Sequence, residues 1–326
     1  MTRESRERKR ATLRDLAAAT GLSTAGASYA LRGERVAPAT AARVREAAER
    51  IGFRSDPIAR ALRGGPTGLV GVIGGSLADF WHQEFAAELQ RHLRARGRHM
   101  LLTDAGGDAA AEIELAQSLA DQRVDGLVAL PVDPATPGWR AIVAALPTVA
   151  VGAALPAPAG AIRFAADAGI RLVLDHLREA GHHRVLVLTS GVHRPTRRPG
   201  VRTVRCGFAA AEARAAATRV LRRADRPTAV FALSDALAYG TYMACVDLGL
   251  DVPADVAVAG FDDHPLSALV APPLTSVSWD TAGAAAAAAT MLVQAIEGDR
   301  QAREVVVAPR LRARRSTAPH ARRQST

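Results

Sequence analysis

Residues 11–33 have the sequence ATLRDLAAATGLSTAGASYALRG, and its pattern predicts the fold of the N-terminal part of the chain. Thr12 is placed to cap a short helix, with Asp15 three residues later in the spacing of a capping box. Gly21 ends that helix, and Ser23 is placed to cap a second one. Two short capped helices joined by a glycine turn predict a helix-turn-helix.

The second helix of this pair carries side chains suited to contact with DNA. Small or hydrogen-bonding side chains occupy its exposed positions, and these let a helix approach base edges in the major groove: Thr24, Ala25, Gly26, Ser28 and Tyr29. A third helix begins at Pro38 and places apolar residues on one face: Val44, Ala47, Ala48 and Ile51. The three helices are expected to share one core.

Basic residues are concentrated at the start of the chain, which has 326 residues and a formal net charge of +10. Residues 1–63 contain thirteen Arg and one Lys against seven acidic residues, a net charge of +7. Residues 64–309 carry −3, and the tail from Arg310 onward has six Arg and no acid. A compact basic segment is typical of a polyanion binder. A solvated basic tail is the alternative, and the helical pattern favours DNA binding.

Composition excludes several classes of protein. The apolar fraction of 48% is ample for a packed core, and no apolar run is long enough to span a membrane. The N-terminus lacks the apolar stretch of a signal peptide, so we expect a cytoplasmic protein. Cys206 and Cys245 lack the spacing of a metal site and are interpreted as small buried residues. We expect no cofactor, no metal site and no enzymatic motif such as a nucleophile elbow.

Residues 64–68, GGPTG, form a linker to a larger α/β region. Short apolar strands alternate there with amphipathic helices, which is typical of parallel, doubly wound sheets. Strands are predicted at residues 69–73, 99–103, 126–130, 148–151, 184–189, 229–233 and 256–261. Helices are predicted at residues 84–96, 109–121, 169–180 and 235–248.

The first 63 residues resemble the DNA-binding headpiece of the LacI/GalR (lactose-repressor) family. The similarity lies in residues 11–33, in RVAPATAARVREAAERIGF at residues 35–53, and in ARALR at residues 59–63. The resemblance implies a hinge helix at residues 56–63, with Leu62 as an apolar wedge in the minor groove. The DNA-contacting residues it implies, with the helix caps, are Thr12, Ser23, Thr24, Ala25, Ser28, Tyr29, Arg32, Ala59 and Leu62.

Four positions depart from the family pattern. Tyr29 stands where a base-reading Arg is common, and Arg32 stands where Asn is usual. Ala37 replaces the usual Ser cap, and Ser55 stands where Pro is frequent. Because a phenol cannot make the bidentate contact of Arg to guanine, the operator sequence of relatives does not transfer to this chain.

Residues 69–326 resemble the periplasmic-binding-protein-like sensor of the same family, which has two doubly wound parallel-sheet subdomains. The similarity lies in DQRVDGLVALP at residues 121–131, RPTAVFALSDALAYG at 226–240 and LGLDVPADVAVAGFDDHPL at 248–266. The resemblance implies that the chain crosses between subdomains near Arg163, near residues 278–280 and near Arg310. A helix at residues 281–297 would pack back on the first subdomain.

Effector contacts in the cleft between subdomains are implied at five positions. Asp262 matches a hydroxyl-binding Asp of the family, and a carboxylate accepts hydrogen bonds from two neighbouring sugar hydroxyls. Phe80 and Trp81 follow the first strand, where the family places aromatic rings. Ser234 and Arg205 complete the set, although Asp235 beside Ser234 also suits a helix cap and Arg205 is one step from the family position.

The second subdomain is shortened near residues 214–219. Relatives have roughly 25 to 30 more residues at this point, in keeping with the length of a βα unit. The sheet is therefore predicted to lack a strand, which would alter or remove effector binding.

These features predict a transcription regulator of the repressor class. It would bind a pseudo-palindromic operator as a homodimer, because one headpiece contacts only a half-site. A small-molecule effector, expected to be a sugar, would bind in the cleft. The alternatives are a soluble sugar-binding protein without a DNA role, and a regulator that has lost its effector response.

Overall fold

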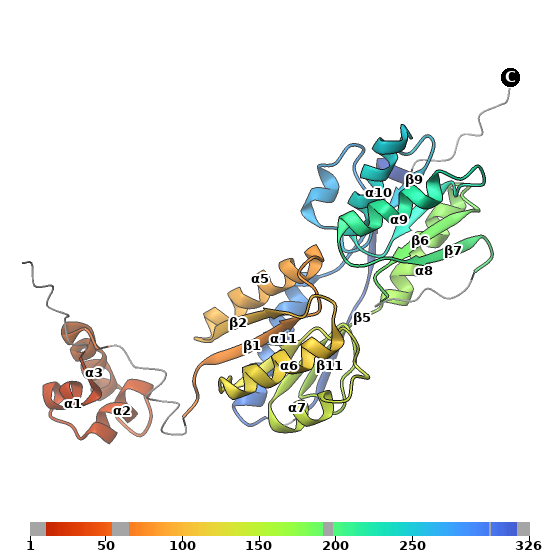
Figure 1. Ribbon diagram of the computed structural model, residues 1–326. Coiled ribbons are helices and arrows are strands. Elements are labelled where there is room, and N and C mark those ends of the chain that lie inside the picture. Colours follow the sequence, from red (N-terminus) through yellow and green to blue (C-terminus); the bar gives the residue numbers. More distant parts are fainter. Residues whose placement is uncertain (1–10, 54–64, 192–197, 300, 318–326) are drawn as a thin grey trace, which may run out of the picture. The chain divides into compact units, whose positions relative to one another are not determined.

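The computed structural model describes residues 11–53, 65–191, 198–299 and 301–317. The chain forms two compact units, Met1–Thr67 and Gly68–Thr326 (Figure 1). The hinge segment predicted at residues 56–63 lies outside the described residues, and so do Ala59 and Leu62.

The first unit contains the three predicted helices, α1 (Leu13–Thr20), α2 (Thr24–Arg32) and α3 (Pro38–Ile51). The predicted capping box is present, because the Thr12 backbone N–H donates to the Asp15 carboxylate at 2.8 Å while the Thr12 hydroxyl accepts from the Asp15 N–H at 3.3 Å. Small and aliphatic side chains from all three helices form one buried core: Leu16, Ala17, Ala27, Ala30, Val44, Ala47 and Ala48. The predicted helix-turn-helix is therefore confirmed as α1 and α2.

The second unit begins with a six-stranded parallel sheet in the order β11-β5-β4-β3-β1-β2. Its strands are β1 (Leu69–Gly74), β2 (His99–Asp104), β3 (Gly126–Ala129), β4 (Thr148–Val151), β5 (Gly160–Phe164) and β11 (Arg303–Val307). Apolar residues on both faces require helices on both sides. Figure 1 shows α5 (Phe80–Ala95) beside α11 (Thr281–Ile296), and these two cover one face. Helices α6 (Ala109–Asp121) and α7 (Trp139–Ala145) cover the other.

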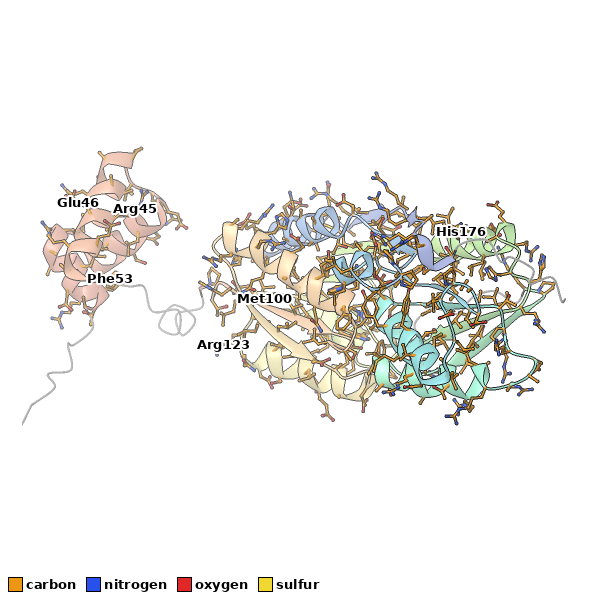
Figure 2. The ribbon with its side chains drawn as sticks, turned by 90° about the horizontal axis from the view of Figure 1, so that it is seen from above. Arg45, Glu46, Phe53, Met100, Arg123 and His176 are labelled. Carbon is orange, nitrogen blue, oxygen red and sulfur yellow. The ribbon has the colours of Figure 1, made fainter. Side chains whose placement is uncertain are left out.

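A second parallel sheet has the order β7-β6-β8-β9. Its strands are β6 (Val185–Thr189), β7 (Val201–Arg205), β8 (Ala229–Ala232) and β9 (Ala257–Ala259). Helix α8 (Ala166–Glu179) packs on one face, and α9 (Ala210–Leu221) and α10 (Asp235–Leu248) pack on the other. Met100 on β2 and His176 on α8 lie toward opposite ends of the second unit (Figure 2). The two sheets therefore define two subdomains, as the resemblance implied.

The chain passes between the subdomains three times. The first passage lies between β5 and α8, and the second follows β10 (Ser276–Ser278), after which α11 packs on the first subdomain. The third leads from β11 to β12 (Arg310–Arg312), and β12 pairs antiparallel with β10. These passages lie at the predicted positions. The two-stranded ladder of β10 and β12 therefore lies at the connection between the subdomains.

The sequence predictions lack two helices, α7 and α9, and five strands, β5, β7, β10, β11 and β12. Strand β7 contains three polar side chains among its five residues and is largely exposed because it lies at the sheet edge, so it lacks the continuous apolar run that marks a buried parallel strand. The described part of the second sheet has four strands against six in the first. The edge strand beside β6 is β7, which precedes Gly207 in the chain. No further strand follows Gly207 in the described residues before α9.

Candidate functional site

A cavity of about 80 Å³ lies between the two subdomains. Its lining comes from loops that follow the carboxyl ends of strands in both sheets, and from the connecting segments. Open α/β folds bind ligands at this edge. The lining residues are Gly75, Asp79, Trp81, His82, Leu130, Pro131, Val132, Val151, Gly152, Ala153, Phe164, Ser190, Phe208, Leu233, Phe261, Asp262 and Trp279. Typical ligand pockets are roughly 300–1,000 Å³, so this cavity is small.

Aromatic rings form a continuous series along the cavity. Trp81 meets Phe164 edge to face, with ring centroids 4.9 Å apart, and Phe164 meets Trp279 in the same way at 5.2 Å. Trp279 then meets Phe261 at 5.4 Å. Trp81 belongs to the first subdomain and Phe261 to the second, while Phe164 and Trp279 lie on the connecting segments. The series therefore links the two cores directly, through edge-to-face contacts that each contribute about 0.5–1.5 kcal/mol.

Asp262 lies in the cavity lining, as its sequence position predicted. Its φ of 101° lies in a region that residues other than glycine rarely adopt, and the backbone is held there by a hydrogen bond from its N–H to the Val277 carbonyl at 2.7 Å. The indole Nε1 of Trp279 donates to the Asp262 carboxylate at 3.0 Å. Burial, with Asp79 and Asp235 nearby, raises the pKa of Asp262 well above its usual range.

The buried carboxylate of Asp235 fixes the loop that presents Asp262. It accepts hydrogen bonds from the His264 N–H at 2.7 Å, the Ser267 hydroxyl at 2.5 Å and the Ser276 hydroxyl at 2.6 Å. Burial raises the pKa of Asp235 to about 7. Asp235 is thus a loop-positioning residue, a role that the sequence suggested only as a possible helix cap.

Phe80 and Trp81 take different positions although they are adjacent in sequence. Trp81 lines the cavity. Phe80 instead packs against residues of the second subdomain, with its ring centroid 6.0 Å from Tyr239 and 5.1 Å from His264. Asp79 caps α5 by accepting from the Trp81 N–H at 3.0 Å, and this cap directs the two rings apart.

Ser234 and Arg205 are not brought into the lining. The Ser234 hydroxyl caps α10 by accepting from the Leu237 N–H at 3.4 Å, and the side chain is buried. Arg205 is exposed and donates from Nε to the carbonyl of Ser190, a neighbouring lining residue, at 3.0 Å. Both side chains therefore form hydrogen bonds within the protein.

Sequence reasoning missed several lining residues: Asp79, His82, Phe164, Ser190, Phe208, Phe261 and Trp279. A usable signal existed for the aromatic ones, because Phe164, Phe261 and Trp279 each stand at or just after the end of a strand. Asp79 precedes a Phe-Trp pair at a helix start, where a cap is expected. The chain passages near Arg163 and residues 278–280 were predicted, but their neighbouring rings were not assigned to the site.

The exposed surface of the first unit contains the predicted start of the recognition helix. Thr24 and Ala25 are exposed, while Ser28 and Tyr29 are half-buried. The Ser23 hydroxyl caps α2 by accepting from the Gly26 N–H at 3.0 Å. The Arg35 guanidinium lies 5.2 Å from the centre of the Tyr29 ring, which orients that ring. Arg32 belongs to α2, and its side chain lies outside the described residues.

The described parts of the chain contain no group of three or more His, Cys, Asp or Glu side chains that could hold a metal ion. No described helix is long and apolar enough to cross a membrane. Cys206 and Cys245 are free thiols, and burial raises the pKa of each to about 11.

Comparison with known proteins agrees with this architecture. Residues 174–317 match the family described as periplasmic binding protein-like domain. The ribose operon repressor of Escherichia coli K12 is 28% identical over 293 residues, covering 82% of this chain and 87% of the relative. The repressor PurR of Vibrio atlanticus is 26% identical, covering 82% and 86%. The Lac repressor dimer bound to operator and an anti-inducer has a TM-score of 0.78 at 23% identity, covering 95% and 100%.

The fold and the cavity define a regulator with a helix-turn-helix unit and a periplasmic-binding-protein-like sensor. The chain is therefore similar to the ribose operon repressor and to PurR repressors in sequence and to the Lac repressor in fold, and its residues 174–317 form a periplasmic-binding-protein-like domain.

Glu112 on α6 supports the cavity wall and generates a prediction about pH. Its buried carboxylate accepts from the N–H of Val132, a lining residue, at 3.0 Å, and burial raises its pKa to about 7. The native state therefore binds more protons than the unfolded state between the ordinary pKa of 4.5 and about 7, so stability falls as pH rises through that window.

We expect Glu112→Gln to remove this loss, because glutamine accepts the same hydrogen bond without a charge. At about 1.4 kcal/mol per pKa unit, the variant should gain on the order of 2–3 kcal/mol relative to the wild type between pH 5 and pH 8. Urea unfolding at several pH values measures the difference. Glu114→Gln, at an exposed position of the same helix, is the control and should show no such trend. A flat difference for Glu112→Gln would contradict the assignment.

Proposed function

We propose that the chain is a transcriptional repressor that binds a pseudo-palindromic operator as a homodimer and responds to a small molecule bound between its subdomains. The observation that carries this proposal is the presence, in one chain, of a capped helix-turn-helix and of a cavity at the ends of two parallel sheets. Relatives that are named repressors support it.

The DNA contacts are proposed at the exposed face of α2. Thr24 and Ala25 stand at the start of that helix, where recognition helices contact bases, and Ser28 and Tyr29 follow one turn later. Thr12 and Ser23 cap α1 and α2 and so stand at helix N-termini, whose partial positive charge favours phosphates. Arg32, Ala59 and Leu62 remain predictions from the sequence.

Effector binding is proposed at Asp262 and Trp81, which line the cavity. A carboxylate accepts hydrogen bonds from hydroxyl groups, and this is the ground for expecting a sugar from the sequence. Arg205 does not line the cavity but donates to the carbonyl of Ser190, which does. Phe80 packs against His264, and Ser234 caps α10. A bound ligand would change the distance between the subdomains, because the cavity lies between them.

Exposed apolar side chains of the second subdomain support a homodimer. Met243 and Val246 lie one turn apart on α10, with exposures of 46% and 79%, and Leu269 is 77% exposed. The Tyr239 hydroxyl forms a 2.8 Å hydrogen bond with Ser267 of the turn η1 (Pro265–Ala268), which places that turn beside α10. Apolar surface of this kind favours association with a second copy.

The DNA-binding proposal is tested with a gel shift on genomic fragments, followed by fluorescence anisotropy at several salt concentrations. We expect Tyr29→Phe to cost about 1–3 kcal/mol of specific binding, because it removes a base-contacting hydroxyl while keeping the ring beneath Arg35. Binding to nonspecific DNA should not change. If Tyr29→Phe binds the operator as the wild type does and Tyr29→Ala does not, the residue acts through packing only.

The dimer proposal is tested by placing a charge in the apolar surface. We expect Val246→Asp to weaken dimerisation at least tenfold in sedimentation velocity and to weaken operator binding in parallel, because a buried unpaired carboxylate is costly. Val306→Asp is the matched control, since Val306 is 55% exposed at the edge strand β11 of the other sheet. Equal dimer affinity in the two variants would rule out this surface.

A further inference from the structure

The cavity wall has an unusual concentration of aromatic rings. The chain contains three Trp, three Tyr and seven Phe residues, yet five of these line this one cavity: Trp81, Phe164, Phe208, Phe261 and Trp279. Successive rings meet at steep angles, 84° for Trp81 with Phe164, 76° for Phe164 with Trp279 and 70° for Trp279 with Phe261. Rings at such angles form adjoining walls rather than a flat stack. The negative faces of aromatic rings attract cations, and such cages bind quaternary ammonium groups.

The charged groups of the lining are acidic. Asp79 and Asp262 are its carboxylates, and no Lys or Arg of the described residues is part of it. Asp79 uses one oxygen on the Trp81 N–H and Asp262 uses one on the Trp279 indole, which leaves the second oxygen of each carboxylate for a ligand. Two nearby cations are engaged elsewhere, since Arg314 pairs with Asp263 at 2.6 Å and Arg205 donates to a backbone carbonyl.

Anionic and neutral ligands fit this lining less well than a cation does. An anion beside Asp79 and Asp262 would oppose the ionised form of Asp262, whose pKa burial already raises, whereas a cation favours that form. A neutral polyol needs several hydrogen-bonding side chains, and beyond the two carboxylates and the indoles the described lining offers His82 and Ser190. The ring of His82 already contacts the Ser76 carbonyl at 2.7 Å.

The size of the cavity points in the same direction. Its volume of about 80 Å³ is roughly half that of an apolar cavity known to hold benzene. It therefore suits a compact head group better than a whole sugar ring, with the rest of the ligand extending toward the opening between the subdomains.

We propose that the effector carries an ammonium group, and that the group is held by the aromatic walls and by the carboxylates of Asp79 and Asp262. This inference rests on the proposed function, because it names the ligand chemistry of the same cavity. The ammonium group is either the protonated amine of an amino sugar or a quaternary alkylammonium. A positive charge replaces the water that these carboxylates lose on burial, and the ring faces add to its binding.

The test measures binding to the full-length chain by calorimetry and by tryptophan fluorescence, since Trp81 and Trp279 line the cavity. Choline is compared with its uncharged isostere 3,3-dimethylbutan-1-ol, and glucosamine with glucose. We expect one of the two ammonium ligands to bind at least tenfold more tightly than its neutral counterpart. Which pair shows the preference distinguishes an alkylammonium from an amino sugar.

Variants localise the effect. Asp262→Asn should lower the affinity for the preferred ammonium ligand at least tenfold while leaving the neutral counterpart within twofold. Asp79→Asn is the second variant, because asparagine also caps a helix and preserves the start of α5. Glu114→Gln, at an exposed position on α6, is the control and should bind as the wild type does. Thermal unfolding checks that each variant is folded.

Equal affinity for the charged and neutral members of both pairs would overturn the proposal, and so would the absence of binding by both ammonium ligands. Tight binding of glucose or ribose, with release of operator DNA, would overturn the ammonium proposal while the proposed repressor function stands. Failure of the proposed function is separate, because it would appear as the absence of specific operator binding in the gel shift without any ligand.

Discussion

The buried carboxylate of Asp235 is the contact on which the candidate site depends. Removing a carboxylate from water is costly, and here the cost is offset by three hydrogen bonds, two from the segment between β9 and β10 and one from Ser276, the first residue of β10. Those bonds hold the backbone after Asp262 and Asp263, both of which have a positive φ. Without them the strained turn would relax, and the Asp262 carboxylate would leave the position where Trp279 donates to it.

The connecting segments extend this dependence from one loop to the relation between the subdomains. Phe164 and Trp279 stand on two of the three passages and contact each other as well as the rings of the two cores. A change in the angle between subdomains must therefore break or slide edge-to-face contacts. Because packed aromatic interfaces prefer discrete arrangements over continuous deformation, this series favours a few defined orientations. A ligand that contacts Trp81 and Trp279 acts on the same rings that set the orientation.

Local sequence patterns were sufficient for the elements of the first unit and for most strands of the second. Thr12, Ser23 and Pro38 each mark a helix start through a hydrogen bond or a fixed backbone angle that needs no distant partner. Strand β7 escaped prediction because its pattern reflects its place at a sheet edge, which only the complete sheet defines. Residues 201–205 are mostly polar, and they form a strand because they pair with β6.

The candidate site was less predictable for the same reason. Asp262 lies in the cavity lining, and its position at a strand end is encoded locally, so the sequence could single it out. The Ser234 hydroxyl caps α10, and a helix cap and a ligand contact look alike in sequence, so its proposed contact with the effector stays a prediction. Trp279 lies far from Trp81 along the chain, so the aromatic wall arises only when the passages bring them together through Phe164.

The distribution of charge gives the two binding surfaces opposite electrostatics. The net charge of +7 in residues 1–63 favours the phosphates of DNA, while residues 64–309 carry −3 and include the carboxylates of the cavity. A basic effector pocket would attract nucleic acid to the wrong part of the chain, and an acidic one repels it. For the same reason a cationic effector gains nothing from the headpiece, where arginine outnumbers the acidic residues. Segregation of charge along the chain thus keeps two ligands of opposite sign at separate sites, which is the condition for one to regulate the binding of the other.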